Sequence, residues 1–508
     1  MRTRRYPLAA IAGVVSAAVF LAAAELVALL AAKEASPLLA LGGFVIDIVP
    51  QPVKELAIAV FGAMDKVALL AGLGVAVAVA AVLAGMLQLR FPPSGLIVIG
   101  AAGAATLATT VTRPGATALA WAPSVVGVVA GGVVLVALIR RLRPPSSAPE
   151  EGVDRRGFLL IATIAGASAL VVGLGSRALN GVTTSITAIR EALRLPSPRS
   201  RVTIPDGAEL DVPGLSPLFT PNADFYRVDT ALTVPTVDPA EWRLIVDGMV
   251  GERIELTFDD LLAMGLDEYA VTLTCVSNEV GGGLVGNALW QGVPVRDVLA
   301  LARPQEGADM VLSTSVDGFT ASTPLTSLTD DAIDAILAVA MNGEPLPLEH
   351  GFPVRMVVPG LYGYVSATKW VTELTVTTFA QDEAYWTPRG YSAKAPIKMS
   401  SRIDTPRSGT PVDAGTVAVA GVAWAQTVGI SRVEVSIDDG DWQEAELSAP
   451  VNEDTWVQWK LAWEAEAGTH YIAVRATDAD GNLQIQERAP IAPDGASGWQ
   501  RTLVTVRG

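Results

Sequence analysis

The sequence predicts a multi-domain protein with an N-terminal α-helical transmembrane bundle, a central α+β domain and a C-terminal immunoglobulin-like β-sandwich. Three observations predict this order. Long apolar runs fill the first third of the chain, strand and helix patterns mix in the middle, and short strands alternate with turns after Pro396. We expect residues 1–180 to form the membrane domain, 181–217 a linker, 218–395 the α+β domain and 396–508 the sandwich.

Charge is divided unevenly along the 508 residues, whose net charge is -16. Residues 1–195 carry more Lys and Arg than Asp and Glu, whereas the remainder is strongly acidic. This division is typical of a membrane region joined to an acidic soluble region. The acidic part excludes a nucleic-acid partner, because it cannot neutralise a phosphate backbone.

Apolar runs are the basis for the membrane prediction, since a helix needs about 20 mostly apolar residues to cross a bilayer. Basic residues flank these runs on alternate sides, which by the positive-inside rule places the N-terminus in the cytoplasm and everything after Ser176 outside it. We therefore expect the lipid bilayer as a partner. The five expected spans are Leu8–Ala32, Val67–Leu87, Gly95–Val111, Trp121–Ile139 and Phe158–Ser176.

The stretch Asp154–Leu160, with Arg155 and Arg156, has two interpretations. It resembles a twin-arginine export signal, and it also serves as an ordinary basic flank. None of the expected spans contains a histidine, and the chain has no C-x-x-C-H motif. With a single cysteine in addition, we expect no haem and no iron–sulfur cluster in this chain.

Cys275 is the only cysteine. The alternation in Val271–Thr274 predicts a strand that ends at this thiol, and Gly281–Gly283 then let backbone amides approach a ligand closely. A lone thiol is a small buried hydrophobe, a nucleophile that needs a base such as His350, or a ligand to a soft metal held by a cofactor. The residues alone leave these three alternatives open.

A series of motifs in fixed order distinguishes between them. In this order the motifs resemble the molybdenum-cofactor domain of the sulfite oxidase family, and the resemblance extends over roughly residues 215–508. The motifs are Thr274–Leu299 with its W-x-G-V-P segment Trp290–Pro294, then Ser315–Gly318, Met341–Pro347, His350–Arg355 and Pro359–Tyr364, followed by Ser366, Lys369 and Trp370.

The resemblance implies a molybdenum–molybdopterin cofactor with Cys275 as the protein ligand of the metal. It also implies contacts to the cofactor's phosphate and pterin, for which an arginine can supply two parallel donors. For His350 the alternative is a satisfied loop histidine, and for Tyr364 a core aromatic. The cofactor-binding residues implied are Asn222, Tyr226, Arg227, Cys275, Asp317, His350, Arg355, Ser366 and Lys369, and the catalytic residues implied are Cys275, Arg227, Asp229 and Tyr364.

The segment around Asp229 departs from the animal and plant members of the family. Asn222 and Phe225–Thr230 are closer to its bacterial protein-methionine-sulfoxide reductase branch. Asp229 stands where the sulfite oxidases have an arginine that binds an anionic substrate, and Arg227 lies two residues earlier. Because a carboxylate repels an oxyanion, sulfite is not expected as the substrate.

After Pro396 the pattern is that of a sandwich without a disulfide. Turns such as Asp438–Gly440 separate the expected strands. This part resembles the family's dimerisation domain, so we expect a homodimer through it. The expected strands are Val417–Val422, Arg432–Asp438, Trp442–Leu447, Trp456–Trp463 and His470–Asp478.

The sequence thus predicts a membrane-anchored molybdopterin-dependent oxidoreductase in the plasma membrane of a bacterium. It would catalyse two-electron oxygen-atom transfer on a small or protein-borne substrate outside the cytoplasm, with an unidentified redox partner. One alternative is a catalytically inactive membrane scaffold or binding protein with a sulfite-oxidase-like domain. Another is a metal-free thiol enzyme that uses Cys275 and His350.

Overall fold

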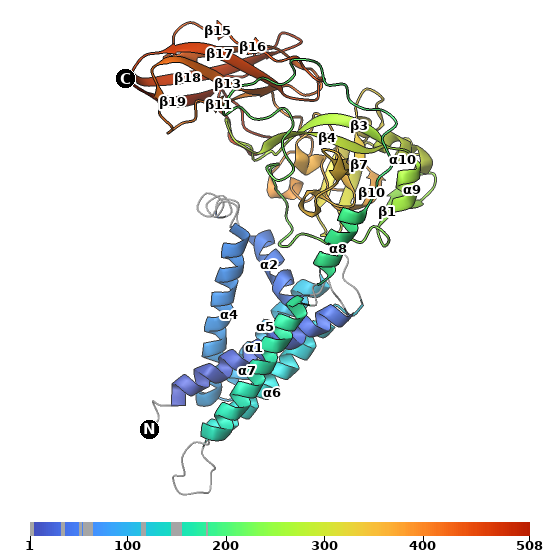
Figure 1. The fold of residues 1–508 in the computed structure, drawn as a ribbon. Coiled ribbons are helices and arrows are strands. Elements are labelled where there is room, and N and C mark those ends of the chain that lie inside the picture. Colours follow the sequence, from blue (N-terminus) through green and yellow to red (C-terminus); the bar gives the residue numbers. More distant parts are fainter. Residues whose placement is uncertain are drawn as a thin grey trace. The chain divides into compact units, whose positions relative to one another are not determined.

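The computed structural model describes residues 5–31, 36–49, 53, 65–112, 118–143, 155–178 and 181–508. The chain divides into two compact units. The membrane unit comprises residues 1–184 with 231–233, and the catalytic unit comprises residues 185–230 with 234–508. Figure 1 shows the helices of the first unit in blue to green and the strands of the second in yellow-green to red.

The described part of the membrane unit is helical, as predicted. The helices long and apolar enough to cross a membrane span Tyr6–Leu30, Ala68–Arg90, Ser94–Val111 and Ala122–Leu142, and they coincide with the first four expected spans. The fifth expected span lies in α7, where Arg156–Ala169 forms a shorter apolar stretch, and it stays a prediction. Asp154 lies outside the described residues. The helices are α1 (Tyr6–Ala31), α2 (Pro37–Ile48), α4 (Asp65–Arg90), α5 (Ser94–Val111), α6 (Ala122–Leu142) and α7 (Arg155–Ala178).

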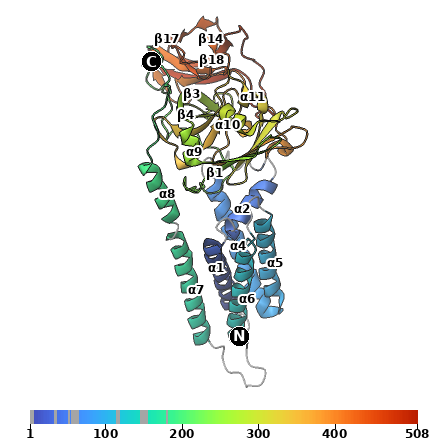
Figure 2. The ribbon, with the colours of Figure 1, turned by 90° about the vertical axis from the view of Figure 1, so that its right-hand side faces the viewer.

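Helix α1 is the centre of this unit and contacts α4, α6 and α7 (Figure 2). It crosses α4 closely because both helices have glycine at the contact. A Cβ on Gly13 would meet the carbonyl of Ala81, and a Cβ on Gly85 would meet the carbonyl of Ala9. Small residues at helix contacts allow the close packing that holds helices together in lipid.

The catalytic unit begins with an α+β lobe, which we define as residues 185–230 and 234–399. Its first sheet has the order β2-β1-β10-β5-β6, with β1 and β10 parallel and the other pairs antiparallel. Its second sheet has the order β3-β4-β7-β8, and β9 also pairs with β7. The strands are β1 (Arg243–Gly248), β2 (Ile254–Thr257), β3 (Asp267–Thr274), β4 (Val285–Pro294), β5 (Met310–Ser315), β6 (Thr320–Pro324), β7 (Ile336–Met341), β8 (Glu344–Pro345), β9 (Arg355–Val357) and β10 (Val371–Thr377).

Short helices α9 (Phe258–Ala263), α10 (Val295–Ala302) and α11 (Leu325–Thr329) complete this lobe. Helix α10 buries Val295, Val298, Leu299 and Ala302, which are spaced three to four residues apart and so share one face. This face joins the core that β1, β7 and β10 also line. The mixed α+β fold was predicted correctly.

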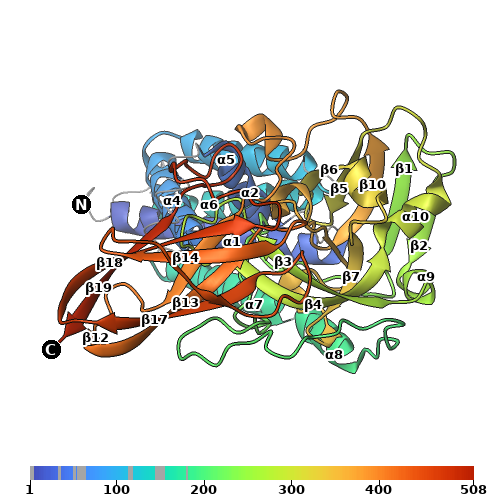
Figure 3. The same cartoon turned by 90° about the horizontal axis from the view of Figure 1, so that it is seen from above.

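The sandwich lobe, residues 400–508, packs two sheets face to face, with orders β11-β13-β17-β16 and β12-β19-β18-β14-β15 (Figure 3). All strand pairs are antiparallel except β12 with β19. The predicted sandwich is confirmed. Three of its strands, β11, β12 and β19, were not predicted. The strands are β11 (Ser400–Thr405), β12 (Val412–Asp413), β13 (Gly415–Trp424), β14 (Ile430–Ile437), β15 (Gln443–Glu444), β16 (Glu446–Leu447), β17 (Val457–Ala465), β18 (Gly468–Asp478) and β19 (Gln500–Arg507).

Most of the segment expected as a linker, from residue 185 onward, packs on the catalytic unit. Helix α8 (Gly181–Ala192) contributes Ile186, which is 3% exposed, to a core cluster with Phe225 and Trp290. Further along, the amide of Leu210 donates to Gln458 Oε1 in the sandwich lobe. The apolar residues of α8 account for this packing. The sequence suggested a linker because the stretch after α8 is rich in Pro and Ser.

Side chains of the sandwich lobe support the strand that leads to Cys275. The amide of Trp456 donates to Thr272 Oγ1 at 2.9 Å, and its indole Nε1 donates to the carbonyl of Leu218 at 2.9 Å. Arg402 Nη1 donates to the carbonyl of Gly282 at 3.1 Å. The two lobes therefore hold the glycine-rich loop between them.

Candidate functional site

Cys275 lies directly after β3 and is 8% exposed. Its amide donates to Leu284 O at 2.9 Å, its carbonyl accepts from Asn278 N at 3.0 Å, and its Sγ accepts from Ser277 N at 3.4 Å. Burial raises the pKa of the thiol, because nothing in this apolar position compensates a thiolate fully. A cation at Sγ would reverse that preference.

Arg355 opens β9 and is 5% exposed. Its guanidinium donates only to backbone carbonyls, those of Met356, His350 and Ala367, and it lies 5.1 Å from the ring of Trp290. No carboxylate pairs with it among the described residues. Burial lowers its pKa to about 10. A buried cation without a counter-ion is costly, so this position calls for an anionic ligand.

His350 ends the 3-10 helix Leu348–His350 and is 3% exposed. Its Nε2 lies 3.1 Å from the carbonyl of Asn222, so the neutral ring carries its proton on Nε2. Burial, and then the charge of Arg355, lower its pKa to about 4. The next residue, Gly351, has a φ of +112° and leaves no room for a Cβ between Arg355 and Lys369. The turn thus brings the two cationic residues together.

Among the described residues, the structure records no hydrogen bond between Cys275 and His350. The histidine is neutral and donates to a backbone carbonyl, and the thiol accepts from a backbone amide. This arrangement lacks the nucleophile–base contact that a metal-free thiol enzyme needs.

Asp229 lies between two cations. Its Oδ2 accepts from Lys369 Nζ at 2.7 Å and from Arg227 Nε at 2.9 Å, and its side chain is 4% exposed. Burial lowers the pKa of Lys369 to about 8, although Asp229 acts in the opposite direction. The cluster of one anion and two cations is net positive, so the carboxylate is neutralised and does not by itself repel an anion.

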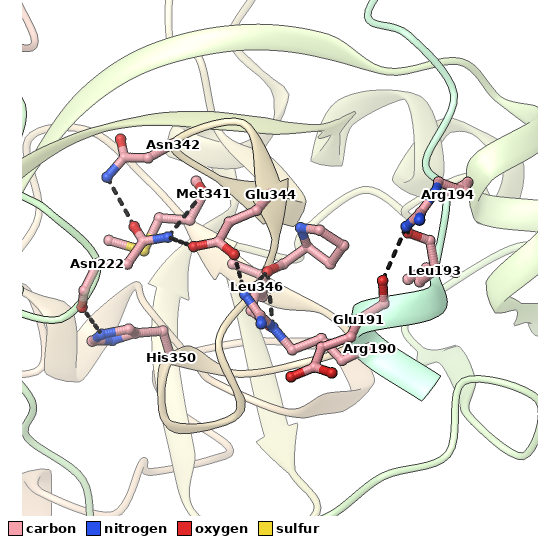
Figure 4. Close-up of polar contacts among 11 residues, drawn as sticks. Arg190, Glu191, Leu193, Arg194, Asn222, Met341, Asn342, Glu344, Leu346 and His350 are labelled. Carbon is pink, nitrogen blue, oxygen red and sulfur yellow. Dashed lines mark hydrogen bonds and ion pairs between the residues drawn. The ribbon is translucent and has the colours of Figure 1, made fainter. Parts of the chain in front are cut away.

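Asn222 and Tyr226 approach the same region from the segment before β1. The ring of Tyr226 stacks on Phe225, with centroids 5.3 Å apart. Burial raises the pKa of the Tyr226 hydroxyl, and nearby Cys275 adds to this effect. Asn222 contacts His350 through its carbonyl and the β7–β8 turn through its amide (Figure 4). The structure therefore gathers Asn222, Tyr226, Cys275, His350 and Arg355 in one region.

Comparison with known proteins supports this geometry. Residues 231–386 match the family described as oxidoreductase molybdopterin binding domain, and residues 392–491 match the Mo-co oxidoreductase dimerisation domain. The sulfite oxidase of Gallus gallus is 32% identical over 321 residues, which cover 54% of this chain and 69% of the chicken protein. The chain belongs to the sulfite oxidase family.

Other members of the family share less of their length with it. The mitochondrial sulfite oxidase of Rattus norvegicus is 34% identical over 321 residues, so that 54% of this chain spans 58% of the rat protein. An NADH nitrate reductase of Spinacia oleracea is 29% identical over 318 residues, which cover 50% of this chain and 34% of the plant protein. The crystal structure of the sulfane dehydrogenase SoxCD from Paracoccus pantotrophus has a TM-score of 0.51 at 23% identity, covering 60% of this chain and 86% of that one, and shows the shared fold.

The residues present fit the cofactor that the sulfite oxidase family carries. A buried thiol with one weak donor suits a metal, and the unpaired guanidinium of Arg355 suits a phosphate. Neutral His350 and the amide of Asn222 supply polar contacts of the kind that a pterin edge offers. The fit rests on the buried positive charge of Arg355, which pairs with no carboxylate among the described residues.

Three further residues implied by the family resemblance are bonded to the protein's own loops. Asp317 accepts from Thr230 Oγ1 at 3.3 Å and from Phe319 N at 3.2 Å. Ser366 donates to two carbonyls at 3.0 Å, and Tyr364 OH donates to Ser392 O at 2.6 Å. In the structure these side chains shape the loops around the site.

Lys398 and Asp494 lie beside this site, and the sequence did not identify either of them as a site residue. Lys398 Nζ donates to Asp494 Oδ1 at 2.9 Å and to Gly495 O at 2.7 Å. Next to them, burial raises the pKa of Tyr362 to about 12, with smaller contributions from Asp494 and Cys275. Nothing in the sequence around Asp494 places it near Cys275.

A cavity of about 520 Å³ lies between the two lobes, and Gly281–Gly283 form part of its wall. Arg402, Asp404 and Trp456 of the sandwich lobe also line it. Solvent therefore reaches the glycine-rich loop from the side of the sandwich lobe.

Proposed function

We propose that this chain is a membrane-anchored molybdopterin-dependent oxidoreductase in which Cys275 ligates the metal. The observation that carries the proposal is the buried guanidinium of Arg355, which has carbonyl acceptors but no carboxylate partner in the described part of the chain. A molybdenum–molybdopterin cofactor, when bound, supplies a metal that exchanges two electrons and an oxygen atom with a substrate. The protein's part is to bind, orient and tune.

Different residues of the site bind the cofactor, orient it and shape the loops around it. The thiolate of Cys275 holds the metal, and Arg355 with Lys369 holds the phosphate side of the cofactor. His350 and Asn222 orient the pterin through neutral polar contacts. Tyr226 closes the apolar side, while Asp317, Ser366 and Tyr364 keep the surrounding loops in shape.

Substrate selection follows from charge. Arg227 and Lys369 outnumber Asp229 at the site, and this net positive charge attracts an anionic or oxygen-bearing polar group. The substrate is small or carried on another protein. A separate redox partner accepts or supplies the electrons, because we expect no haem or iron–sulfur cluster in this chain.

The anchor and the location follow from the membrane unit. Side chains such as Val75, Ile97 and Val133 are apolar and more than half exposed, as lipid-facing residues are. The distribution of the basic flanks supports a location of the catalytic unit outside the cytoplasm, and we propose the plasma membrane of a bacterium as its site. The exposed pair Tyr471 and Leu503, opposite each other on β18 and β19, suits a homodimer contact of the sandwich lobe.

The test is the molybdenum and pterin content of the full chain, purified in detergent from a host that makes the cofactor. Wild type should carry roughly one molybdenum per chain, as a resident cofactor does. The Cys275→Ser variant should keep its fold but lose metal or show an altered molybdenum spectrum. A folded wild-type protein that carries neither metal nor pterin would overturn the proposal in favour of a scaffold.

A further inference from the structure

Arg190, in the last turn of α8, binds strand β8 and the residue that follows it. Its Nε donates to Leu346 O at 2.8 Å and to Pro345 O at 3.1 Å. Its Nη2 donates to Pro345 O at 2.7 Å and to Glu344 Oε2 at 2.9 Å (Figure 4). The side chain is only 16% exposed. One guanidinium thus contacts three consecutive residues, Glu344 to Leu346.

Glu344 connects Arg190 to Asn222. While Arg190 binds one carboxylate oxygen, the other, Oε1, accepts from Asn222 Nδ2 at 2.7 Å. Partial burial acts to raise the pKa of Glu344, but the hydrogen bonds from Asn222 and Arg190 outweigh it and lower the pKa below its usual range. The carboxylate is therefore ionised at neutral pH and makes charge-assisted hydrogen bonds on both sides.

Asn222 in turn is fixed in one orientation. Its Nδ2 donates to Glu344 and to the carbonyl of Met341, while its Oδ1 accepts from Asn342 Nδ2 at 2.8 Å. With both ends of the amide assigned, its backbone carbonyl faces His350 Nε2 at 3.1 Å. An unbroken path of polar contacts leads from α8 to the histidine.

Helix α8 is also packed on the lobe by its apolar residues. Ile186 is buried, and Leu193 packs against the same cluster as Trp290 and Leu346. Arg190 points from this docked helix toward Glu344 (Figure 4). In the sequence, only residues 179 and 180 separate α8 from the apolar helix α7.

We propose that Arg190 is a positioning residue. Through Glu344 it holds Asn222 and His350 in the positions from which they contact the pterin. The inference rests on the proposed function, since it needs a bound cofactor. It means that the segment joining the anchor to the catalytic unit is part of the cofactor site. Loss of the Arg190–Glu344 contact frees the Asn222 amide to turn, and the cofactor then leaves faster.

The experiment measures the rate of pterin release from the full chain in detergent, well below the melting temperature. Arg190→Gln should release pterin roughly 10-fold faster than wild type, a change that corresponds to about 1.4 kcal/mol. Arg190→Lys, which keeps the charge opposite Glu344 but not the fork of donors, should be intermediate. The matched control is Arg194→Gln, because Arg194 lies four residues along and, within the described ranges, donates only to the local carbonyls of Glu191 and Leu193.

Glu344→Gln provides a second variant that can be read even if Arg190→Gln folds poorly. It should also speed release, and the double variant should be no faster than the faster single one, because both act through the same path. Release from Arg190→Gln and Glu344→Gln at the wild-type rate would overturn the positioning role while leaving the cofactor in place. Equal acceleration by Arg194→Gln would overturn it too, since charge alone would then explain the effect. A wild type without pterin would remove both this inference and the proposed function.

Discussion

The ammonium Nζ of Lys369 lies 2.7 Å from Oδ2 of Asp229, with 11% and 4% of the two side chains exposed. Arg227 completes the group. The residue that stands in place of a family arginine is therefore not an isolated carboxylate. It is the anion that allows two cations to approach each other at the site.

Removal of this anion should lower the stability of the catalytic unit. Asp229→Asn leaves the buried charge of Lys369 uncompensated, and breaking a buried pair costs about 3–5 kcal/mol. We expect the melting temperature of the catalytic unit to fall by several degrees. The double variant Asp229→Asn with Lys369→Met should recover much of the loss, because no unpaired charge remains, and an equally unstable double variant would contradict this account.

Replacement of Arg355 should change the stability of the protein much less than replacement of Asp229. Its guanidinium is buried without a carboxylate among the described residues, so Arg355→Met removes an unpaired charge at the cost of three carbonyl contacts. The cofactor-free protein should change in stability by no more than about 1 kcal/mol, since these opposing effects are similar in size. Pterin content should nevertheless fall sharply. Thermal melts of cofactor-free protein and pterin assays of loaded protein check the two halves, and a variant that keeps its pterin would refute the phosphate contact.

The buried carboxyl group of Asp454 should make the stability of the protein depend on pH. Burial, followed by the charges of Asp334 and Glu453, raises its pKa to about 7, and its Oδ1 has no hydrogen-bond partner among the residues that the structure describes. Between its ordinary pKa and about 7 the unfolded chain has lost this proton while the folded chain keeps it, so stability falls as pH rises through this window. The stabilising effect of the protonated form is complete only at lower pH.

Asp454→Asn should therefore raise the melting temperature at pH 8 by several degrees and leave it unchanged near pH 4. Asp439→Asn is the control, because its side chain is 71% exposed. Melting curves from pH 4 to 8 would show the difference between wild type and Asp454→Asn growing with pH. A constant difference would mean that Asp454 does not titrate in this range.

Helix α8 provides a matched pair of isoleucines. Ile186 is 3% exposed and belongs to the core cluster, whereas Ile189 on the same helix is 36% exposed. Ile186→Ala should destabilise the catalytic unit by about 2–4 kcal/mol, and Ile189→Ala by less than about 1 kcal/mol. Denaturant titration of the full chain, followed by the fluorescence of the buried tryptophans, would measure both. Equal effects would mean that α8 is only a tether.

Much of the architecture could be predicted because local patterns determine it. Apolar length predicted the helices of the membrane unit that are long enough to cross a membrane. The sandwich strands were predicted by their turns. Strand β19 was missed although buried and exposed residues alternate along Gln500–Arg507. Its partner β18 ends at Asp478, so no short hairpin turn joins the two strands.

The site could be predicted only in part. Cys275, His350 and Arg355 stand in short motifs, so sequence alone identified them. The partners of these residues come from elsewhere in the chain. The pairing of Lys369 with Asp229, the contact of Arg190 with Glu344 and the approach of Asp494 depend on tertiary packing, for which sequence spacing gives no signal.

The loop after Cys275 depends on a part of the chain that lies far from it in the sequence. Gly281 lies against the side chain of Gln500, and Gly282 accepts a hydrogen bond from Arg402. Gln500 opens β19 and Arg402 lies in β11, so both contacts come from strands of the sandwich lobe. The backbone around the thiol therefore takes its shape only when that lobe is folded, and a change that unfolds the sandwich would disturb the thiol loop without touching any residue of the α+β lobe.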